Sequence, residues 1–151
     1  MKDNLSGYRR GVGIVLRNPL RQVLMTRRIK EKAWQFPQGG IDLGESDEDA
    51  LFREMMEELG TNKADIVTKI KYPLTYNFPK TLDHPYPYKG QAIQWFLLNF
   101  NGHDDDINLN TPHPEFDMWM WSDFNTAIDR IVDFKKDMYQ KICQEFFDFL
   151  I

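Results

Sequence analysis

The sequence contains a single cysteine and no long apolar run. That cysteine, Cys143, cannot form an intrachain disulfide, and its apolar neighbours near the end of the chain indicate a packed thiol. No stretch approaches the roughly eighteen apolar residues of a membrane helix, and the start of the chain lacks the apolar segment of a secretory signal. We therefore expect a cytoplasmic protein that does not bind a membrane.

Internal repeats, low-complexity tracts and linkers rich in Pro, Gly or Ser are also missing. The 151 residues are 42% hydrophobic and 14% aromatic, so the chain is long enough for one sizeable core and too short to suggest two. We expect a single domain over residues 1–151 that acts as a monomer.

The chain lacks an excess of positive charge, because its formal net charge is −4. This charge is unevenly spread: residues 1–32 carry +7, and the rest of the chain carries −11. Mild overall acidity argues against nonspecific coating of nucleic acid. The basic N-terminal segment could nevertheless meet a few phosphates of an anionic ligand.

Short runs rich in β-branched residues predict a sheet. Residues 11–17 and 22–27 are separated by Asn18 and Pro19, which predicts a strand, a turn and a second strand. Further strands are predicted over residues 64–72, 91–100 and 118–121, and the run 91–100 is apolar enough to be central in the sheet. Between the strands predicted over residues 64–72 and 91–100 we expect an aromatic loop, with Tyr76, Phe78, Tyr86 and Tyr88.

Three helices are predicted between and after these strands. The clearest begins at Ser46, which forms a capping-box signature with Asp49, and ends at Gly60. Its apolar stripe consists of Ala50, Leu51, Met55 and Leu59. Two others are predicted from Asp123 to about residue 132 and over residues 135–149. The elements together predict a mixed α/β domain.

Glu54, Glu57 and Glu58 are spaced i, i+3, i+4, so their carboxylates project from one side of the first helix. Such a cluster can be an ordinary solvated surface, but without a partner its charges repel. A hard divalent cation such as Mg²⁺ would relieve the repulsion, because it prefers oxygen ligands from carboxylates, water and phosphate. Just before the helix, the segment Gln38 to Gly40 offers backbone carbonyls that could also reach this metal.

The spacing of these residues resembles the Nudix hydrolases, whose box reads Gx5Ex7REUxEExGU, where U is a bulky apolar residue. The matching positions are Gly39, Glu45, Arg53, Glu54, Met55, Glu57, Glu58, Gly60 and Thr61, and only Thr61 departs from the pattern. The resemblance implies an α/β/α sandwich with a mixed β-sheet between helices. It also implies hydrolysis of a nucleoside diphosphate linked to another group, with Mg²⁺ as cofactor, for which Mn²⁺ or another divalent cation could substitute.

The same resemblance assigns roles within the box. Glu54, Glu57 and Glu58 would bind the metal together with Gln38, while Arg53 and Glu45 would orient the cluster. Bound metal would neutralise the pyrophosphate and lower the pKa of an attacking water. Which carboxylate acts as the general base stays open.

The resemblance extends over nearly the whole chain to bacterial RNA pyrophosphohydrolases and the related dinucleoside polyphosphate hydrolases. It is carried by the stretches GYRRGVGIV, AWQFPQGGI, KGQAIQWFLLNF, PEFDMWMW and VDFKKDMY. It implies that Arg9 and Arg28 meet substrate phosphates and that Gln91 and Phe134 lie near the base. It further places Lys135 beside the 5′ end of the substrate and makes Glu115 a catalytic-site acid outside the box.

Each of these residues also has a plainer interpretation. Arg9 and Arg28 could be surface charges, Phe134 could belong to the core, and Glu115 could be a solvated loop acid. The chain has Gln94 where the subfamily often has a lysine, which would shift phosphate binding toward Arg9, Arg28 and Lys135. Residues His84, His103 and His113 lack ligand-like spacing.

Three functions remain open from the sequence. The first is Mg²⁺-dependent removal of pyrophosphate from the 5′-triphosphate end of RNA, leaving a 5′-monophosphate, as the step that initiates mRNA decay. The second is asymmetric hydrolysis of diadenosine polyphosphates such as the tetraphosphate. The third, a domain that binds nucleotide without hydrolysing it, is disfavoured because every glutamate of the box is present.

Overall fold

The computed structural model describes residues 5–80 and 87–150. In this part of the chain an eight-stranded mixed sheet has the order β3-β2-β1-β7-β5, with β4 on β1, β6 on β7 and β8 on β2. The strands are β1 (Tyr8–Arg17), β2 (Val23–Arg28), β3 (Trp34–Gln35), β4 (Gln38–Gly40), β5 (Ala64–Lys69), β6 (Leu74–Asn77), β7 (Gly90–Phe100) and β8 (Phe116–Ser122). The long central pair, β1 and β7, is parallel, and the other strand pairs are antiparallel.

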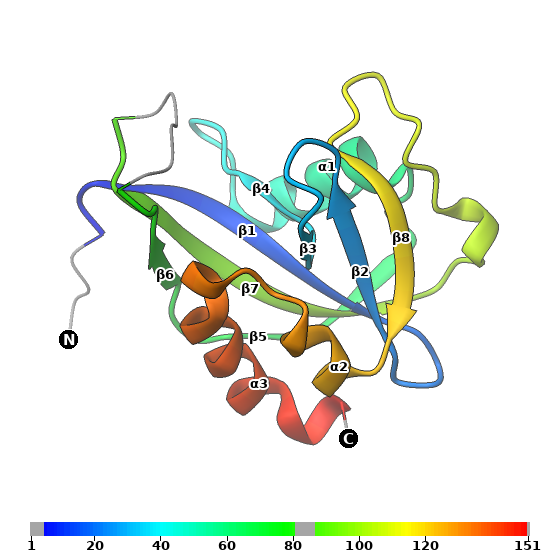
Figure 1. The fold of residues 1–151 in the computed structure, drawn as a ribbon. Coiled ribbons are helices and arrows are strands. Elements are labelled where there is room, and N and C mark those ends of the chain that lie inside the picture. The colour runs from blue at the N-terminus through cyan, green and yellow to red at the C-terminus, as the bar shows by residue number, and fades with distance from the viewer. Residues whose placement is uncertain (1–4, 81–86, 151) are drawn as a thin grey trace.

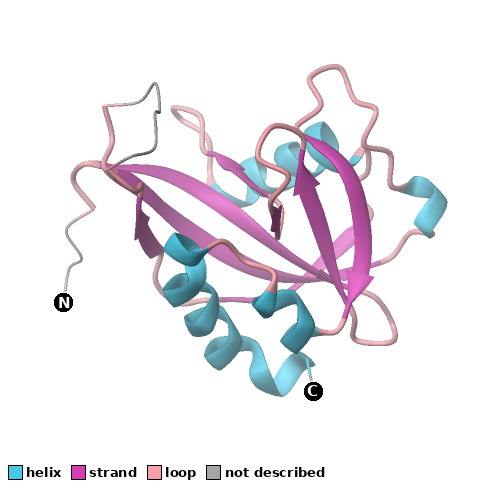
Figure 2. Ribbon diagram, viewed as in Figure 1, coloured by secondary structure: helices cyan, strands magenta, loops and turns pink. Residues whose placement is uncertain are grey.

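Helices cover both faces of this sheet, as Figures 1 and 2 show. On one face lies α1 (Asp47–Leu59), and on the other lie α2 (Phe124–Asp129) and α3 (Lys136–Leu150). Short 3-10 helices occupy Asp104–Asp106 and Asp133–Lys135. Two apolar cores result, one under each helical layer, and the expected α/β/α sandwich is confirmed. Among the described residues, none of the helices has the length and apolar character to cross a membrane.

The expected helix after Ser46 is confirmed as α1. Ser46 caps it, because its hydroxyl oxygen accepts a hydrogen bond from the Asp49 N–H at 3.1 Å. Gly60 ends it in the left-handed region at φ 71°, where glycine carries no Cβ penalty. The apolar stripe that the sequence indicated is fully buried, and Glu54 and Glu58 are buried beside it.

Several boundaries differ from the expectation. The strand predicted over residues 64–72 ends at Lys69, and the expected aromatic loop contains β6, which forms because Tyr76 pairs with Gln91 on β7. The helix predicted to residue 132 ends at Asp129. Pairing with the earlier strands β2 and β1 also creates β3 and β4, which have only two and three residues and were not predicted. Tyr86 and His84 lie outside the described residues.

The short strand β4 lies at the point where the chain passes from the sheet to α1. Its residues pair with β1 in the register Gly11↔Gly40, Val12↔Gly39 and Gly13↔Gln38. The preceding segment is anchored to α3, because the Phe36 N–H donates to the Tyr139 hydroxyl at 3.0 Å and the two rings stack at 5.0 Å. The segment 34–40 is therefore held between both helical layers.

Candidate functional site

Three carboxylates from α1 meet at the edge of β4. Glu54, Glu57 and Glu58 each place one oxygen within 4.8 Å of the others, and within residues 5–80 and 87–150 no other group of three or more acids, histidines or cysteines meets this criterion. Glu54 and Glu58 are buried, whereas Glu57 is exposed. Glu58 Oε2 is buried without a hydrogen-bond partner in the described part of the chain. A buried carboxylate oxygen left without a donor fits a cation ligand, so the residues present suit a divalent metal.

Arg53 connects this cluster to the loop before the helix. Its guanidinium donates two hydrogen bonds to Glu45, at 2.7 and 2.8 Å, and one to the Gly40 carbonyl at 2.8 Å. The same group reaches Glu54 at 2.9 Å and Glu57 at 3.1 Å. A planar five-donor group suits this work, because it fixes several acceptors at once. The structure thus brings together Arg53 and Glu45, the two residues to which the family resemblance assigned the orienting of the acids.

Gly39 makes room for the Glu54 carboxylate. A Cβ at this position would lie 2.0 Å from the carboxyl carbon of Glu54, which is far inside van der Waals contact. Any other residue at position 39 would displace this carboxylate, so the close approach requires glycine.

Burial and mutual repulsion act on the acids of this cluster. Burial, followed by the negative charges of Glu115, Glu54 and Glu57, raises the pKa of Glu58 to about 8. Burial also raises the pKa of Glu54, against the opposing hydrogen bond from Arg53. Without a cation Glu58 therefore holds a proton near neutral pH, and a bound cation would displace it.

A polar network lies on the α3 side of β4. The Gln91 side-chain oxygen accepts from the Gln38 amide at 2.6 Å and from the Tyr76 hydroxyl at 2.7 Å. The Gln38 side chain thus faces Gln91 and Tyr76, and its own Oε1 is buried without a partner in the described chain. If Gln38 contacts a metal at the acidic cluster, its backbone carbonyl is the group available for it.

Lys135 is buried beside this network, with 7% of its surface exposed. Its ammonium donates to Gln35 Oε1 at 3.2 Å and lies 5.0 Å from the ring centroid of Tyr76. Burial, and then the positive charge of Arg28, lowers its pKa to about 8. The Phe134 ring lies 5.8 Å from that of Tyr76, so one wall of the site is aromatic.

Two arginines complete the cationic side. Arg28 ends β2 and lies 3.6 Å from the Glu115 carboxylate, which joins the cationic side to the acidic cluster. Arg9 crosses β4, because a Cβ on Gly40 would lie 2.3 Å from the Arg9 guanidinium. The charges of both arginines act on the buried Tyr76 hydroxyl. The residues predicted for phosphate and base binding, Arg9, Arg28, Gln91, Phe134 and Lys135, therefore surround one region next to the acids.

Gln94 does not share this region. Side chains alternate along β7, so Gln94 lies on the opposite face from Gln91. It is buried, and its amide donates to the Ile70 carbonyl. A lysine at this position would not point toward Arg28 and Lys135.

The sequence did not single out two residues of the site, Gln35 and Glu31. Gln35 is a polar residue buried within the segment WQF, and it accepts from Lys135. Glu31 lies on the loop after β2 and pairs with Arg28. The only available sequence signals were a polar residue inside an apolar run and an acid inside the basic segment 27–32.

A family model described as NUDIX domain matches residues 7–142, which is most of the chain. The acidic cluster, its arginine and Gly39 lie inside this range. The chain therefore belongs to the Nudix family, and the resemblance found in the sequence is confirmed.

Within this family the chain is similar to bacterial RNA pyrophosphohydrolases. A protein of that name from Hamiltonella defensa is 46% identical, with 99% of this chain and 95% of the relative covered. Another, from Shewanella denitrificans, is 44% identical, with 93% and 85% covered. A solved structure of a C. elegans Ap4A hydrolase binary complex superposes with a TM-score of 0.68, at 21% identity, over 90% of this chain and 96% of that one. At 21% identity, the likeness to this solved structure shows the fold alone.

Proposed function

We propose that this chain is a Mg²⁺-dependent pyrophosphohydrolase that removes pyrophosphate from the 5′-triphosphate end of RNA and leaves a 5′-monophosphate. The observation that carries the proposal is the juxtaposition of an acidic cluster with a cationic and aromatic region, joined through Arg28 and Glu115. The names of the bacterial relatives support the choice of substrate.

The acidic cluster would hold the metal through Glu54, Glu57 and Glu58. Arg53 and Glu45 keep these carboxylates in place, and Gly39 leaves space for Glu54. Bound Mg²⁺ would offset the charge of the phosphates and lower the pKa of a water molecule. One of the acids at this end would accept the proton of the attacking water as the bond between the α- and β-phosphates breaks, so that the RNA keeps a monophosphate and pyrophosphate leaves.

The cationic side would hold the rest of the substrate. Arg28 and Lys135 meet the phosphate chain, and Arg9 approaches it across β4. The first base then lies against Phe134 and within reach of Gln91, because stacking on an aromatic ring holds a base with little dependence on its identity. Arrangement of the triphosphate between fixed cations on both sides would supply most of the rate enhancement.

An RNA substrate places the enzyme in the cytoplasm of a bacterial cell, where transcripts are made. Removal of the triphosphate there would start mRNA decay. We further propose that the protein acts as a monomer and that Mn²⁺ or another divalent cation with oxygen preference could replace Mg²⁺.

The test is kcat/KM in one Mg²⁺ buffer for a triphosphorylated RNA oligomer and for diadenosine tetraphosphate. Glu57→Gln serves as the blank, because it removes an exposed ligand and leaves the buried pair in place. A large preference for RNA supports the proposal. A preference for the dinucleotide would assign the chain to nucleotide hydrolysis instead, and tight binding of both without Mg²⁺-stimulated product would show a binding domain.

A further inference from the structure

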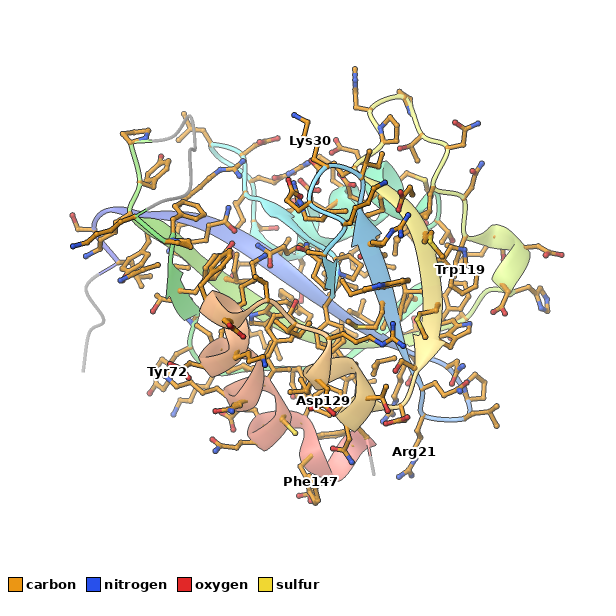
Figure 3. The ribbon with its side chains drawn as sticks, viewed as in Figure 1. Arg21, Lys30, Tyr72, Trp119, Asp129 and Phe147 are labelled. Carbon is orange, nitrogen blue, oxygen red and sulfur yellow. The ribbon has the colours of Figure 1, made fainter. Side chains whose placement is uncertain are left out.

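Glu31 is an acid placed among the cations of the site. It lies on the loop of residues 29–33 between β2 and β3, next to Lys30, which Figure 3 labels. Its carboxylate accepts a short hydrogen bond from Nε of Arg28. About half of the Glu31 side chain, 46%, is exposed, so the pair lies at the surface and not in the core.

A second cation also acts on Glu31. Partial burial raises the pKa of this carboxyl. The hydrogen bond and charge of Arg28, together with the charge of Lys135, outweigh this effect, so the pKa is lowered overall. Reciprocally, Glu31 is the acid that opposes the lowering of the Lys135 pKa by burial and by Arg28. The carboxylate is therefore within electrostatic range of two cations that repel each other.

Without substrate, these two cations need an anion. Lys135 is buried and hydrogen bonded to a neutral amide, and within the described residues it forms no ion pair shorter than 4.0 Å. Arg28 is paired with Glu31 and, at a longer distance, with Glu115. Glu31 thus offers two carboxylate oxygens where a substrate would offer phosphate oxygens.

We propose that Glu31 is an internal counter-ion of Arg28 that takes the place of phosphate at this arginine, beside Lys135, and is displaced when the 5′-phosphates of the substrate bind. This inference rests on the proposed function, which gives Arg28 and Lys135 to the phosphate chain. Glu31 then weakens substrate binding by the free energy of the ion pair with Arg28, which the substrate must break. It plays no part in the chemical step.

The loop can release Glu31 without unfolding. Its backbone is held by hydrogen bonds from Arg28 N–H to the Ala33 carbonyl and from Ile29 N–H to the Glu115 carbonyl, both at 2.9 Å. Lys32, next to Glu31, is fixed to Asp117 at 2.9 Å. Rotation of one half-exposed side chain is therefore enough, so displacement should affect affinity and leave turnover unchanged.

A positioning role for Glu31 would have the opposite sign. If the carboxylate held Arg28 in the orientation that phosphate needs, its loss would raise KM. If it competes with phosphate, its loss lowers KM. The sign of one measured change separates the two roles.

The first experiment compares Glu31→Gln with wild type on triphosphorylated RNA. We expect KM to fall about two- to fivefold, the range for a partly exposed ion pair, with kcat unchanged. The dependence of log kcat/KM on log salt should become steeper, because the substrate no longer frees a carboxylate that recruits a cation. Glu145→Gln, an exposed acid on α3, is the charge-matched control and should leave KM unchanged.

A KM that is unchanged or raised in Glu31→Gln overturns the proposal. So does an equal fall of KM in Glu145→Gln, because the effect would then come from net charge. The Arg28→Gln background adds a coupling test: the Glu31→Gln effect should shrink there, and an undiminished effect would show that Glu31 does not act through Arg28.

Calorimetric titration with inorganic pyrophosphate in Mg²⁺ buffer separates this inference from the proposed function. Tighter binding to Glu31→Gln than to wild type supports the counter-ion even if RNA is not hydrolysed, in which case only the proposed function falls. Equal or weaker binding overturns the counter-ion even if RNA is the substrate.

Discussion

Lys135 holds a positive charge at a buried position, where desolvation and Arg28 both disfavour it. Its neighbours are an amide and two aromatic rings. A charge kept under such conditions costs stability, which a binding role can explain. The titration of Lys135 should therefore be measurable in how the free energy of unfolding depends on pH.

We predict that wild-type stability contains a component that rises between about pH 8 and pH 10.5 and that Lys135→Met removes. The folded pKa is lowered to about 8 from the ordinary 10.5, so in this window the unfolded chain binds more protons than the folded one, and the free energy of unfolding increases with pH. Urea unfolding at several pH values measures it, with exposed Lys141→Met as control. In the same variant KM for RNA should rise about tenfold, the cost of a lost charge-assisted contact. An identical pH dependence in Lys135→Met and wild type would contradict the assigned pKa.

Gly39→Ala should damage metal binding as well as folding. The added Cβ would fall 2.0 Å from the Glu54 carboxyl carbon, and Arg53 restricts the carboxylate that must move. We expect the Mg²⁺ concentration for half-maximal turnover to rise about tenfold or more, with a stability loss of about 1–3 kcal/mol. Activity against Mg²⁺ concentration measures the first, and urea unfolding the second.

Gly102→Ala is a matched control for this variant. Its Cβ would also meet a carboxylate, at 2.7 Å from Asp106, but outside the site. It should lose stability and keep the Mg²⁺ dependence of wild type. If both variants change the Mg²⁺ dependence alike, the Gly39 argument fails.

At the scale of elements, α1 carries the three clustered glutamates of the site, and its stability depends on its two ends. Ser46→Ala removes one capping hydrogen bond and should cost about 1 kcal/mol. Gly60→Ala should cost more, because it forces a side chain into φ 71° and brings a Cβ within 2.8 Å of the Asn108 carbonyl. Urea unfolding of both variants tests the order. Ser46→Ala should retain kcat, and a larger loss in Ser46→Ala than in Gly60→Ala would contradict the account.

The same helix shows how far the sequence reaches. The caps, the apolar stripe and the clustered glutamates of α1 are local signals, and all were predicted at their correct positions. β4 and β6 could not be predicted, because they have few residues and exist through pairs such as Gly11↔Gly40 and Tyr76↔Gln91. These two strands bring Gln38 and Tyr76 into one network, so the base side of the site depends on long-range pairing.

Contacts between residues far apart in the chain could not be predicted from the sequence either. Arg28, Gln91, Phe134 and Lys135 were placed in the site by resemblance and not by any local pattern, and the roles of all site residues remain predictions. Glu31 was missed because nothing in the order of residues shows that its charge acts on Lys135, about a hundred positions away. Gln94, which stands where the subfamily often has a lysine, lies on the face of β7 opposite Gln91, where its amide donates to the Ile70 carbonyl.

At the scale of the whole molecule, the uneven charge of the sequence becomes two sides of one site. The basic N-terminal segment supplies Arg9 and Arg28 from β1 and β2, and the acidic remainder supplies the carboxylates of α1. The sheet, including β4, lies between these opposite charges, with the proposed cation site on one side and the proposed phosphate site on the other. That the chain forms one domain over residues 1–151 stays a prediction.

This arrangement should make the stability of the whole protein depend on pH and metal together. Burial and neighbouring acids raise the folded pKa of Glu58 to about 8 from its ordinary 4.5. Between these values the folded protein binds more protons than the unfolded chain, so without metal its stability falls as pH rises, by an amount of the order of 3 kcal/mol. A divalent cation binds the deprotonated folded form and should reverse this loss, with a larger gain at pH 8 than at pH 6.

Melting temperatures from pH 5 to 8.5, with EDTA and with excess Mg²⁺, measure this prediction. Wild type in EDTA should lose several degrees over the range, since about 1 kcal/mol corresponds to 2–4 °C in a chain of this size. Glu58→Gln removes the titrating carboxyl, so it should melt above wild type in EDTA at pH 8 and gain little from Mg²⁺. If Mg²⁺ stabilises Glu58→Gln as much as wild type, the metal does not bind at Glu58, and the acidic cluster is not the metal site.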